Sequence, residues 1–320
     1  MSLVNTVKGP IDTLALGRVL MHEHIFILSP EMMQNYDTGW REEERVQDAI
    51  AQLRALKRAG IDTLVDQTAV GYGRFIPRIE RIAQELDLHI IVPTGLIDFH
   101  DMPHYFAYRD PSLQRDMLVD MFVSEIEEGI NGGPVKASFI KVATEKHGIN
   151  PGLERILQAA AKAHRITGVP ISTHTDGKRG GVPQQDVFER EGVDLSRVII
   201  GHCGDSTDLD YLRGIMKRGS YVGMDRFGLD PLFPPSYQER AKIVAGLCAE
   251  GLADQILLSH DANCYIDWNP MTPQIAPNSH FRFIPEVVVP LMIEYGVTEH
   301  QLHTMMVDNP RKIFERTGTY

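Results

Sequence analysis

Cysteine is scarce in this sequence, whose 320 residues include three: Cys203, Cys248 and Cys264. An odd number of scattered cysteines without a C-x-x-C pair argues against a disulfide framework and favours a reducing compartment. No apolar run approaches the roughly 20 residues that a membrane-spanning helix needs. Residues 1–17 also lack the basic segment followed by an apolar one that marks a secretory signal. We therefore expect a cytoplasmic protein that does not enter the membrane.

Positive charge is also in deficit. The 32 lysine and arginine residues face 43 aspartate and glutamate residues, which gives a net charge of −11. Without a basic run to offset this balance, a broad phosphate-binding surface and a nucleic-acid partner are not expected. The hydrophobic share of 43% and the charged share of 23% are those of an ordinary globular protein. They exclude a disordered chain, a collagen and a coiled coil.

Short apolar segments alternate with longer amphipathic ones along the chain. Strands are predicted at 19–28, 62–68, 88–96, 137–144, 169–175, 197–203, 220–225 and 255–261. Helices are predicted at 42–60, 74–87, 113–129, 151–168, 236–251 and 299–316. The strands are apolar on both faces, as buried parallel strands are. Eight β–α repeats favour an α/β fold with a (β/α)8 TIM barrel over a doubly wound sheet, which would usually carry a glycine-rich first turn.

The length is compatible with two domains, but one barrel with extensions accounts for it equally well. We expect a single domain over residues 1–320, with a short N-terminal extension at 1–17 and a long loop at 264–280 after the eighth strand. A second long loop is expected at 98–112. Both loops are rich in aromatic residues, which is unlike disorder. They either cap the barrel or take part in function.

Ligand-type side chains recur at the ends of the predicted strands. His22 and His24 share one face of the first strand, since residues two apart point the same way. Lys141 lies inside the apolar fourth strand, where a cation is costly unless it is paired, modified or displaced toward the strand end. His174, His202 and Asp261 end the fifth, sixth and eighth strands. Catalytic residues of barrels gather at this C-terminal face.

Together these residues predict a binuclear metal centre made of His22, His24, Lys141, His174, His202 and Asp261. A carboxylated Lys141 would be an anion able to bridge two ions. Nitrogen and oxygen ligands without thiolate suit zinc, and also cobalt, manganese or iron. Taken singly, each residue could instead be structural.

Several motifs carry a family resemblance that runs from about residue 7 to the C-terminal segment. They are MHEH (21–24), IK (140–141), STHT (172–175), IGHCGDSTD (200–208), MDRFG (224–228), SHDANCYIDW (259–268) and DNPRKIFER (308–316). As a set they resemble the phosphotriesterase branch of the amidohydrolase superfamily, and within it the phosphotriesterase-like lactonases. The resemblance implies a homodimer.

The same resemblance implies roles for the ligands. His22, His24 and Asp261 would hold the more buried of two divalent ions, and His174 and His202 the more exposed one. The carboxylated Lys141 and a hydroxide would bridge the ions, and Asp261 would accept a proton from that hydroxide.

Three further residues match functional positions of the family. Asp205 matches a residue that relays protons outward, Arg226 an arginine near the substrate, and Trp268 an aromatic residue of the lactone pocket. Each has a structural alternative. Asp205 could cap a helix beginning near Ser206, Arg226 could pair with a loop carboxylate, and Trp268 could pack beneath its loop.

The implied activity is hydrolysis of a small hydrophobic lactone, an N-acyl-homoserine lactone above all (quorum quenching), with promiscuous hydrolysis of organophosphate triesters. The predicted substrate-binding residues are Ile97, Phe99, Arg226, Tyr265 and Trp268. Ile97 departs from the lactonases, which usually carry tyrosine there. This departure keeps open a related hydrolase of open-chain carboxylic or phosphate esters. A catalytically silent scaffold barrel is the alternative of another class, although none of the six predicted ligands is missing.

Overall fold

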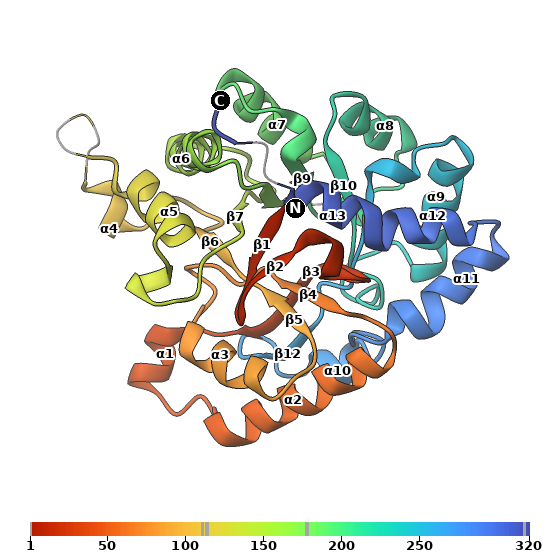
Figure 1. The fold of residues 1–320 in the computed structure, drawn as a ribbon, viewed down its shortest axis with the longest axis horizontal. Coiled ribbons are helices and arrows are strands. Elements are labelled where there is room, and N and C mark those ends of the chain that lie inside the picture. Colours follow the sequence, from red (N-terminus) through yellow and green to blue (C-terminus); the bar gives the residue numbers. More distant parts are fainter. Residues whose placement is uncertain (1, 110–111, 113–114, 177–178, 316–317) are drawn as a thin grey trace.

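The fold is built on parallel strands with helices around them, as the computed structural model shows for residues 2–109, 112, 115–176, 179–315 and 318–320 (Figure 1). The parallel strands are β3 (Val19–Ile27), β4 (Thr63–Asp66), β5 (His89–Ile91), β6 (Pro93–Leu96), β7 (Phe139–Ala143), β8 (Ile171–His174), β9 (Val198–Ile200), β10 (Tyr221–Met224) and β11 (Ile256–Leu258). Each of the eight predicted strand segments contains strand, and the predicted parallel α/β fold is confirmed.

The strands form two sheets, ordered β11-β10-β9-β8-β7-β6 and β12-β3-β4-β5, where β12 is Asn263–Ile266. The two sheets approach each other at both ends. One residue, Val92, separates β5 from β6, so a single extended segment belongs to both sheets. On the other side, the backbone N–H of Asp261 donates to the carbonyl of His22 at 2.9 Å, which joins the end of β11 to β3.

A cluster of buried side chains lies among the N-terminal halves of these strands. It includes side chains from β3, β4, β5, β7, β9, β10 and β11, namely Val19, Met21, Val65, Ile91, Phe139, Ile199, Tyr221 and Leu257. Side chains from so many strands can reach one cluster only if the strands curve around it. A larger cluster packs the outer faces of the strands against the helices.

The helices surround the strands (Figure 1). The predicted helical segments contain α2 (Glu42–Arg58), α3 (Ile76–Gln84), α5 (Met117–Glu127), α6 (Pro151–Thr167), α9 (Tyr237–Ala249), α12 (Glu299–His303) and α13 (Asn309–Phe314). In α2, Val46, Ile50, Leu53 and Leu56 form the buried stripe that the 3.6-residue period predicts. Residues 113–114 of one predicted helix lie outside the described residues.

Other helices were not predicted. They are α1 (Pro30–Asn35), α4 (His104–Ala107), α7 (Gly181–Arg190), α8 (Leu209–Lys217), α10 (Thr272–Ile275) and α11 (Val289–Glu294). The two long loops are therefore partly structured: α4 lies in 98–112, and β12 and α10 lie in 264–280. β12 pairs in parallel with β3, so the segment after β11 returns to the sheet edge before it becomes a loop. Residues 110–111 lie outside the described part of the chain.

The N-terminal extension forms an antiparallel hairpin of β1 (Leu3–Thr6) and β2 (Gly9–Asp12), followed by the short helix η1 (Thr13–Leu16). Figure 1 shows this hairpin lying across the centre of the ring of helices. Val7 N–H donates to the Ile90 carbonyl at 2.9 Å, and the side chains of Val4 and Leu16 join the cluster inside the strands. The hairpin therefore covers the end of the strands opposite to the predicted site. Among the described residues, no helix is long and apolar enough to span a bilayer.

Candidate metal centre and substrate cavity

The predicted ligands from the first and eighth strand segments meet around one carboxylate. Oδ1 of Asp261 lies 3.7 Å from Nε2 of His22 and 3.4 Å from Nε2 of His24. The three side chains form one of two groups in the described chain whose atoms are close enough to hold a metal ion. The alternation of β3 places both imidazoles on the same face, as the sequence predicted.

Lys141 joins this group from β7. Its side chain is 1% exposed, and Nζ lies 3.1 Å from Nε2 of His22 and 3.4 Å from the carbonyl of Thr173. Among the described residues no carboxylate forms an ion pair with it. Burial lowers the pKa of Lys141 to about 7, although Asp261 and Asp225 oppose this shift. A large fraction of the amine is therefore uncharged near neutral pH, which is the form that can react with carbon dioxide.

His174 and His202 form a second pair beside the first group. Nδ1 of His174 lies 2.8 Å from Nε2 of His202. Burial, more than any other influence, lowers the pKa of His174 to about 4 and holds the pKa of His202 well below its usual value. Both rings are therefore neutral at physiological pH, and a neutral imidazole is the form that binds metal.

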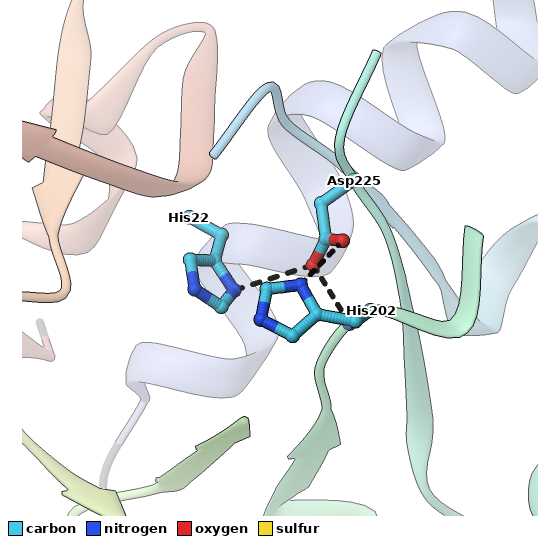
Figure 2. A group of neighbouring side chains, drawn as sticks. All are labelled: His22, His202 and Asp225. Atoms are coloured by element: carbon cyan, nitrogen blue, oxygen red, sulfur yellow. Dashed lines mark hydrogen bonds and ion pairs between the residues drawn. The ribbon is translucent and has the colours of Figure 1, made fainter. Parts of the chain in front are cut away.

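Asp225, at the end of β10, was not predicted and orients two of these rings. Figure 2 shows its carboxylate between His22 and His202. Its Oδ2 lies 3.3 Å from Nδ1 of His22, and its Oδ1 lies 2.9 Å from Nδ1 of His202. An ionised carboxylate only accepts hydrogen bonds, so both Nδ1 atoms carry the proton and both Nε2 lone pairs stay free. The sequence signal was available, because Asp225 ends a predicted strand within MDRFG.

The other two imidazoles are held in the same manner. Nδ1 of His24 lies 2.8 Å from the hydroxyl of Thr68, and Nε2 of His174 lies 2.9 Å from Oε1 of Glu145. These outer contacts leave Nε2 of His24 and Nδ1 of His174 facing the centre. Thr68 ends the strand predicted at 62–68 and Glu145 follows the one predicted at 137–144, but no spacing in the sequence pointed to them.

Glu23, between the two ligand histidines, points away from the centre and fixes the segment that carries Asp261. Its Oε1 accepts hydrogen bonds from the backbone N–H of His260 at 2.9 Å and lies 2.7 Å from Nδ1 of that ring. Its Oε2 accepts from the N–H of Ala262 at 2.9 Å. No spacing in the sequence pointed to Glu23. The backbone N–H of Ile284 donates to Nε2 of His260, so both ring nitrogens of His260 have partners outside the ligand cluster.

Three site residues have an unusual backbone conformation. His202, Arg226 and Asp261 have φ values of 59°, 62° and 57°, and only one other described non-glycine residue, Asn131, has a positive φ. Non-glycine residues in the left-handed region cost free energy and concentrate at functional sites. Each lies just beyond a strand end, and their side chains meet over the C-terminal ends of the parallel strands.

A chain of ion pairs leads from Asp261 away from the centre. Nε of Arg226 donates to Oδ2 of Asp261 at 3.1 Å, and Nη1 of Arg226 donates to Oδ2 of Asp205 at 2.6 Å. The other oxygen of Asp205 accepts from Nη1 of Arg240 at 2.7 Å. Burial raises the pKa of Asp205, whereas the two guanidinium groups act in the opposite direction.

These contacts bear on two of the structural alternatives. The cap of α8 is Asp208, whose side chain accepts from the N–H groups of Asp210 and Tyr211, so Asp205 does not cap that helix. Arg226 pairs with Asp261 and also with Asp205, a carboxylate in the segment after β9, so it does pair with a loop carboxylate. Arg240 was not predicted as a site residue, because an arginine on an amphipathic helix such as α9 is expected at the surface. In the structure its side chain is fully buried.

A cavity of about 300 Å³ opens above the ligand cluster. Its lining includes His24, His174, Asp261, Arg226, Glu145, Asn263, Tyr72, Phe99, Trp268, Ile27, Leu229 and Phe233. Phe99 and Trp268 thus lie where the sequence predicted. The ring of Phe99 packs on His174 with centroids 4.8 Å apart, and Trp268 remains 48% exposed, so it does not pack beneath its loop.

The structure does not bring Ile97 and Tyr265 to the cavity wall. Ile97 is 4% exposed and packs behind the wall with Ile27, Tyr72 and Ala143. Tyr265, on β12, faces outward, where its ring lies 5.7 Å from Trp40 and 4.1 Å from the guanidinium carbon of Arg45. Alternation along β12 is consistent with this placement, because the adjacent Ile266 lines the cavity and successive side chains of a strand point to opposite faces.

Comparison with known proteins agrees with this geometry. The model of the phosphotriesterase family matches residues 2–314. The chain is 52% identical to a phosphotriesterase homology protein of Mycobacterium tuberculosis, covering 99% of each chain, and 34% identical to an aryldialkylphosphatase of Saccharolobus solfataricus, covering 96% of this chain and 98% of the other. A solved structure of the phosphotriesterase from Mycobacterium tuberculosis superposes with a TM-score of 0.96 at 51% identity, covering 99% of this chain and 100% of that one.

The chain belongs to the phosphotriesterase family, and it is a hydrolase of that family.

Proposed function

We propose that this protein is a binuclear metal hydrolase in which the two parallel sheets close into one (β/α)8 barrel, a single domain with the centre at its C-terminal face. The shared β5–β6 segment, the hydrogen bond from Asp261 to His22 and the common interior cluster support closure. The homodimer and the cytoplasmic location stay predictions.

One observation carries the metal proposal: each of the four imidazoles has an outer partner that leaves one nitrogen lone pair facing the centre. Those partners are Asp225 for His22 and His202, Thr68 for His24, and Glu145 for His174. Outer hydrogen bonds of this type orient metal-ligating histidines. The donor set therefore fits two divalent ions, zinc being the first candidate and cobalt, manganese or iron the others.

In this proposal His22, His24 and Asp261 would hold one ion, His174 and His202 would hold the other, and carboxylated Lys141 would be a ligand as well. When bound, the two ions would polarise a substrate oxygen and make water a stronger nucleophile by lowering its pKa.

The remaining chemistry belongs to side chains of the chain. Asp261 has its Oδ1 beside the imidazoles and its Oδ2 on Arg226, so it is held in place to accept a proton from the attacking water. Asp205 lies one guanidinium group farther out, in position to pass that proton toward solvent. Arg226 keeps the two carboxylates apart and also lines the cavity.

We propose a hydrophobic lactone as the substrate, with N-acyl-homoserine lactones as the first candidates and organophosphate triesters as slower substrates. The support is the cavity, whose sixteen lining residues include eight apolar or aromatic ones beside the polar groups of the site. A neutral ester suits this lining better than an anion does, because Glu145 and Asp261 both lie at the wall.

Kinetics of the zinc-reconstituted protein test the proposal with a γ-lactone carrying an acyl chain, an aryl carboxylic ester and an aryl phosphotriester. We expect the highest kcat/KM for the lactone. Preference for the aryl ester or the phosphotriester would favour the alternative, an open-chain ester hydrolase of the same family. Absence of all three activities would contradict both proposals.

A further inference from the structure

Tyr72 is a cavity residue to which nothing in the sequence analysis gave a role. It lies between β4 and α3 in the turn Val70-Gly71-Tyr72-Gly73, and its side chain is 8% exposed while lining the cavity beside the ligand His24. The question is whether this phenol only fills space or contacts the substrate.

The backbone of this turn is held on both sides. The N–H of Tyr72 donates to the carbonyl of Ala69, and its carbonyl accepts from the N–H of Leu28, both at 3.1 Å. Gly71 and Gly73 have φ values of 99° and 80°. A Cβ atom at Gly71 would lie 2.0 Å from the carbonyl oxygen of Ile97, and one at Gly73 would lie 2.6 Å from that of Leu28. The turn is therefore wedged between two neighbouring strand ends, and only glycine fits at either side of the tyrosine.

The ring of Tyr72 is fixed by aromatic neighbours. Its centroid lies 4.8 Å from that of Trp268 at an interplanar angle of 89°, and 5.7 Å from that of Phe99 at 71°. Both are edge-to-face contacts, which stabilise aromatic pairs beyond their buried area. On its other side, Ile97 packs against it from behind the wall. The ring has little freedom to turn.

The hydroxyl group, by contrast, has no hydrogen-bond partner among the described residues. The hydroxyl oxygen is not buried, so solvent reaches it. Since the side chain is otherwise enclosed and lines the cavity, the open space in front of the hydroxyl is the cavity itself. Two other donors of the cavity wall are already engaged: Trp268 donates its indole N–H to Ser29 at 2.9 Å, and Arg226 donates to Asp261 and Asp205.

We infer that Tyr72 is a substrate-binding residue whose hydroxyl donates a hydrogen bond to an acceptor oxygen of a neutral ester bound in the cavity. This inference rests on the proposed hydrolase function and adds a specificity-determining residue to it. The rigid phenol orients the ester over the ligand cluster without any rearrangement of the turn. Tyr72 lines the cavity, where the sequence had predicted Ile97 as a substrate-binding residue.

The test compares Tyr72→Phe with wild-type protein in the zinc-reconstituted form. This substitution keeps the ring and its aromatic contacts and removes only the hydroxyl. Substrates are an N-acyl-homoserine lactone and a γ-alkyl lactone that lacks the amide. A matched control is Tyr221→Phe, because Tyr221 is also 8% exposed but belongs to the interior cluster at the opposite end of the strands.

We expect Tyr72→Phe to lower kcat/KM by about 5- to 150-fold, the range that the loss of one hydrogen bond produces, with metal content and Tm unchanged. A loss of kcat/KM on both lactones would place the hydrogen-bond acceptor in the ring ester. A loss confined to the N-acyl substrate would place the acceptor in the amide. Either result supports the inference. A change of less than twofold on both lactones, in an enzyme whose wild type is active, would overturn it. A wild type inactive on all esters would instead remove the proposed function.

Discussion

His202 and Asp225 are joined at two points, since the carboxylate of Asp225 accepts from the backbone N–H of His202 and from its Nδ1, both at 2.9 Å. The first contact holds His202 in its left-handed backbone conformation, and the second fixes the protonated nitrogen of the ring. The same carboxylate reaches His22 at 3.3 Å. One unpredicted residue thus sets the orientation of two predicted ligands.

Asp225→Asn should therefore weaken metal binding by about 10- to 100-fold, the usual loss when an outer partner of a ligating histidine is removed. The amide presents an N–H group to at least one imidazole, which favours the wrong tautomer. Competition of the protein with a chelator, followed by metal analysis, measures the affinity. Asp210→Asn serves as the control because Asp210 is exposed and pairs with Arg213, away from the ligand cluster. Equal affinities of the two variants would show that Asp225 does not orient the ligands.

Lys141→Ala should abolish hydrolysis and lower the metal content while the protein stays folded, since the amine that is removed forms no ion pair among the described residues. A short-chain carboxylic acid added to the variant should restore part of the hydrolytic activity and part of the metal content, because its carboxylate can occupy the vacated space. Metal content and lactone hydrolysis are measured with and without the acid, and circular dichroism reports folding. Full activity of purified Lys141→Ala would contradict a bridging role for this residue.

Asp261→Asn removes an anionic ligand and the proposed proton acceptor together. We expect kcat to fall by at least about 100-fold, since positioned acid–base groups contribute 10² to 10⁴ in rate.

Wild-type activity should rise with pH through one ionisation that shifts when zinc is replaced by cobalt or manganese. The measurement is the pH dependence of kcat for each metal form. An ionisation that is the same for all metals would point to a side-chain base.

Ile97→Tyr should destabilise the protein by about 1–3 kcal/mol, because the larger ring has to enter a packed cluster. It should displace Tyr72 and reduce lactone and phosphotriester hydrolysis alike, since position 97 lies behind the cavity wall. Denaturant unfolding and kcat/KM on both substrates check this, and Ile97→Val, which is smaller, is the comparison. A variant of wild-type stability with a raised preference for lactones would mean that residue 97 reaches the substrate after all.

His164 predicts a pH dependence of stability away from the metal centre. Burial lowers its pKa below the ordinary value of 6.5, and its ring is held by the carbonyl of Val169 and the hydroxyl of Tyr320. Below about pH 6.5 the unfolded chain therefore binds a proton that the folded chain does not. Its contribution to stability is complete above that pH and is lost as the pH falls toward the folded pKa.

Urea unfolding of His164→Gln and wild type from pH 5 to pH 8 should show a smaller slope of unfolding free energy against pH for the variant. Buried His22, His174 and His202 add slopes of the same sign to both proteins, so the difference between them isolates His164. His300→Gln, an exposed substitution, should leave the slope unchanged. Parallel curves for His164→Gln and wild type would rule out the titration of this ring.

Local patterns in the sequence determined the strands and most helices of this protein. Buried parallel strands are apolar on both faces and amphipathic helices repeat every 3.6 residues, and both signals are local. The six predicted ligands also follow from local information, because ligand-type residues at strand ends meet once the strands are parallel. Helix α7 was not predicted because its buried stripe is interrupted by Gln184 and Gln185. Helix α8 has an apolar stripe of Tyr211, Leu212, Ile215 and Met216, so the sequence did carry its signal.

Only the tertiary structure decided what surrounds those ligands. Asp225, Glu23 and Arg240 act through contacts with residues from 15 to 239 positions away, and no spacing along the chain encodes such distances. Tyr265 faces outward because it lies on β12, a strand that was not predicted, and Ile97 lies behind the wall because the chain turns directly after β6. Tyr72 reaches the cavity because two glycines let its turn fit between neighbouring strand ends, a close approach of backbones that exists only in the folded chain.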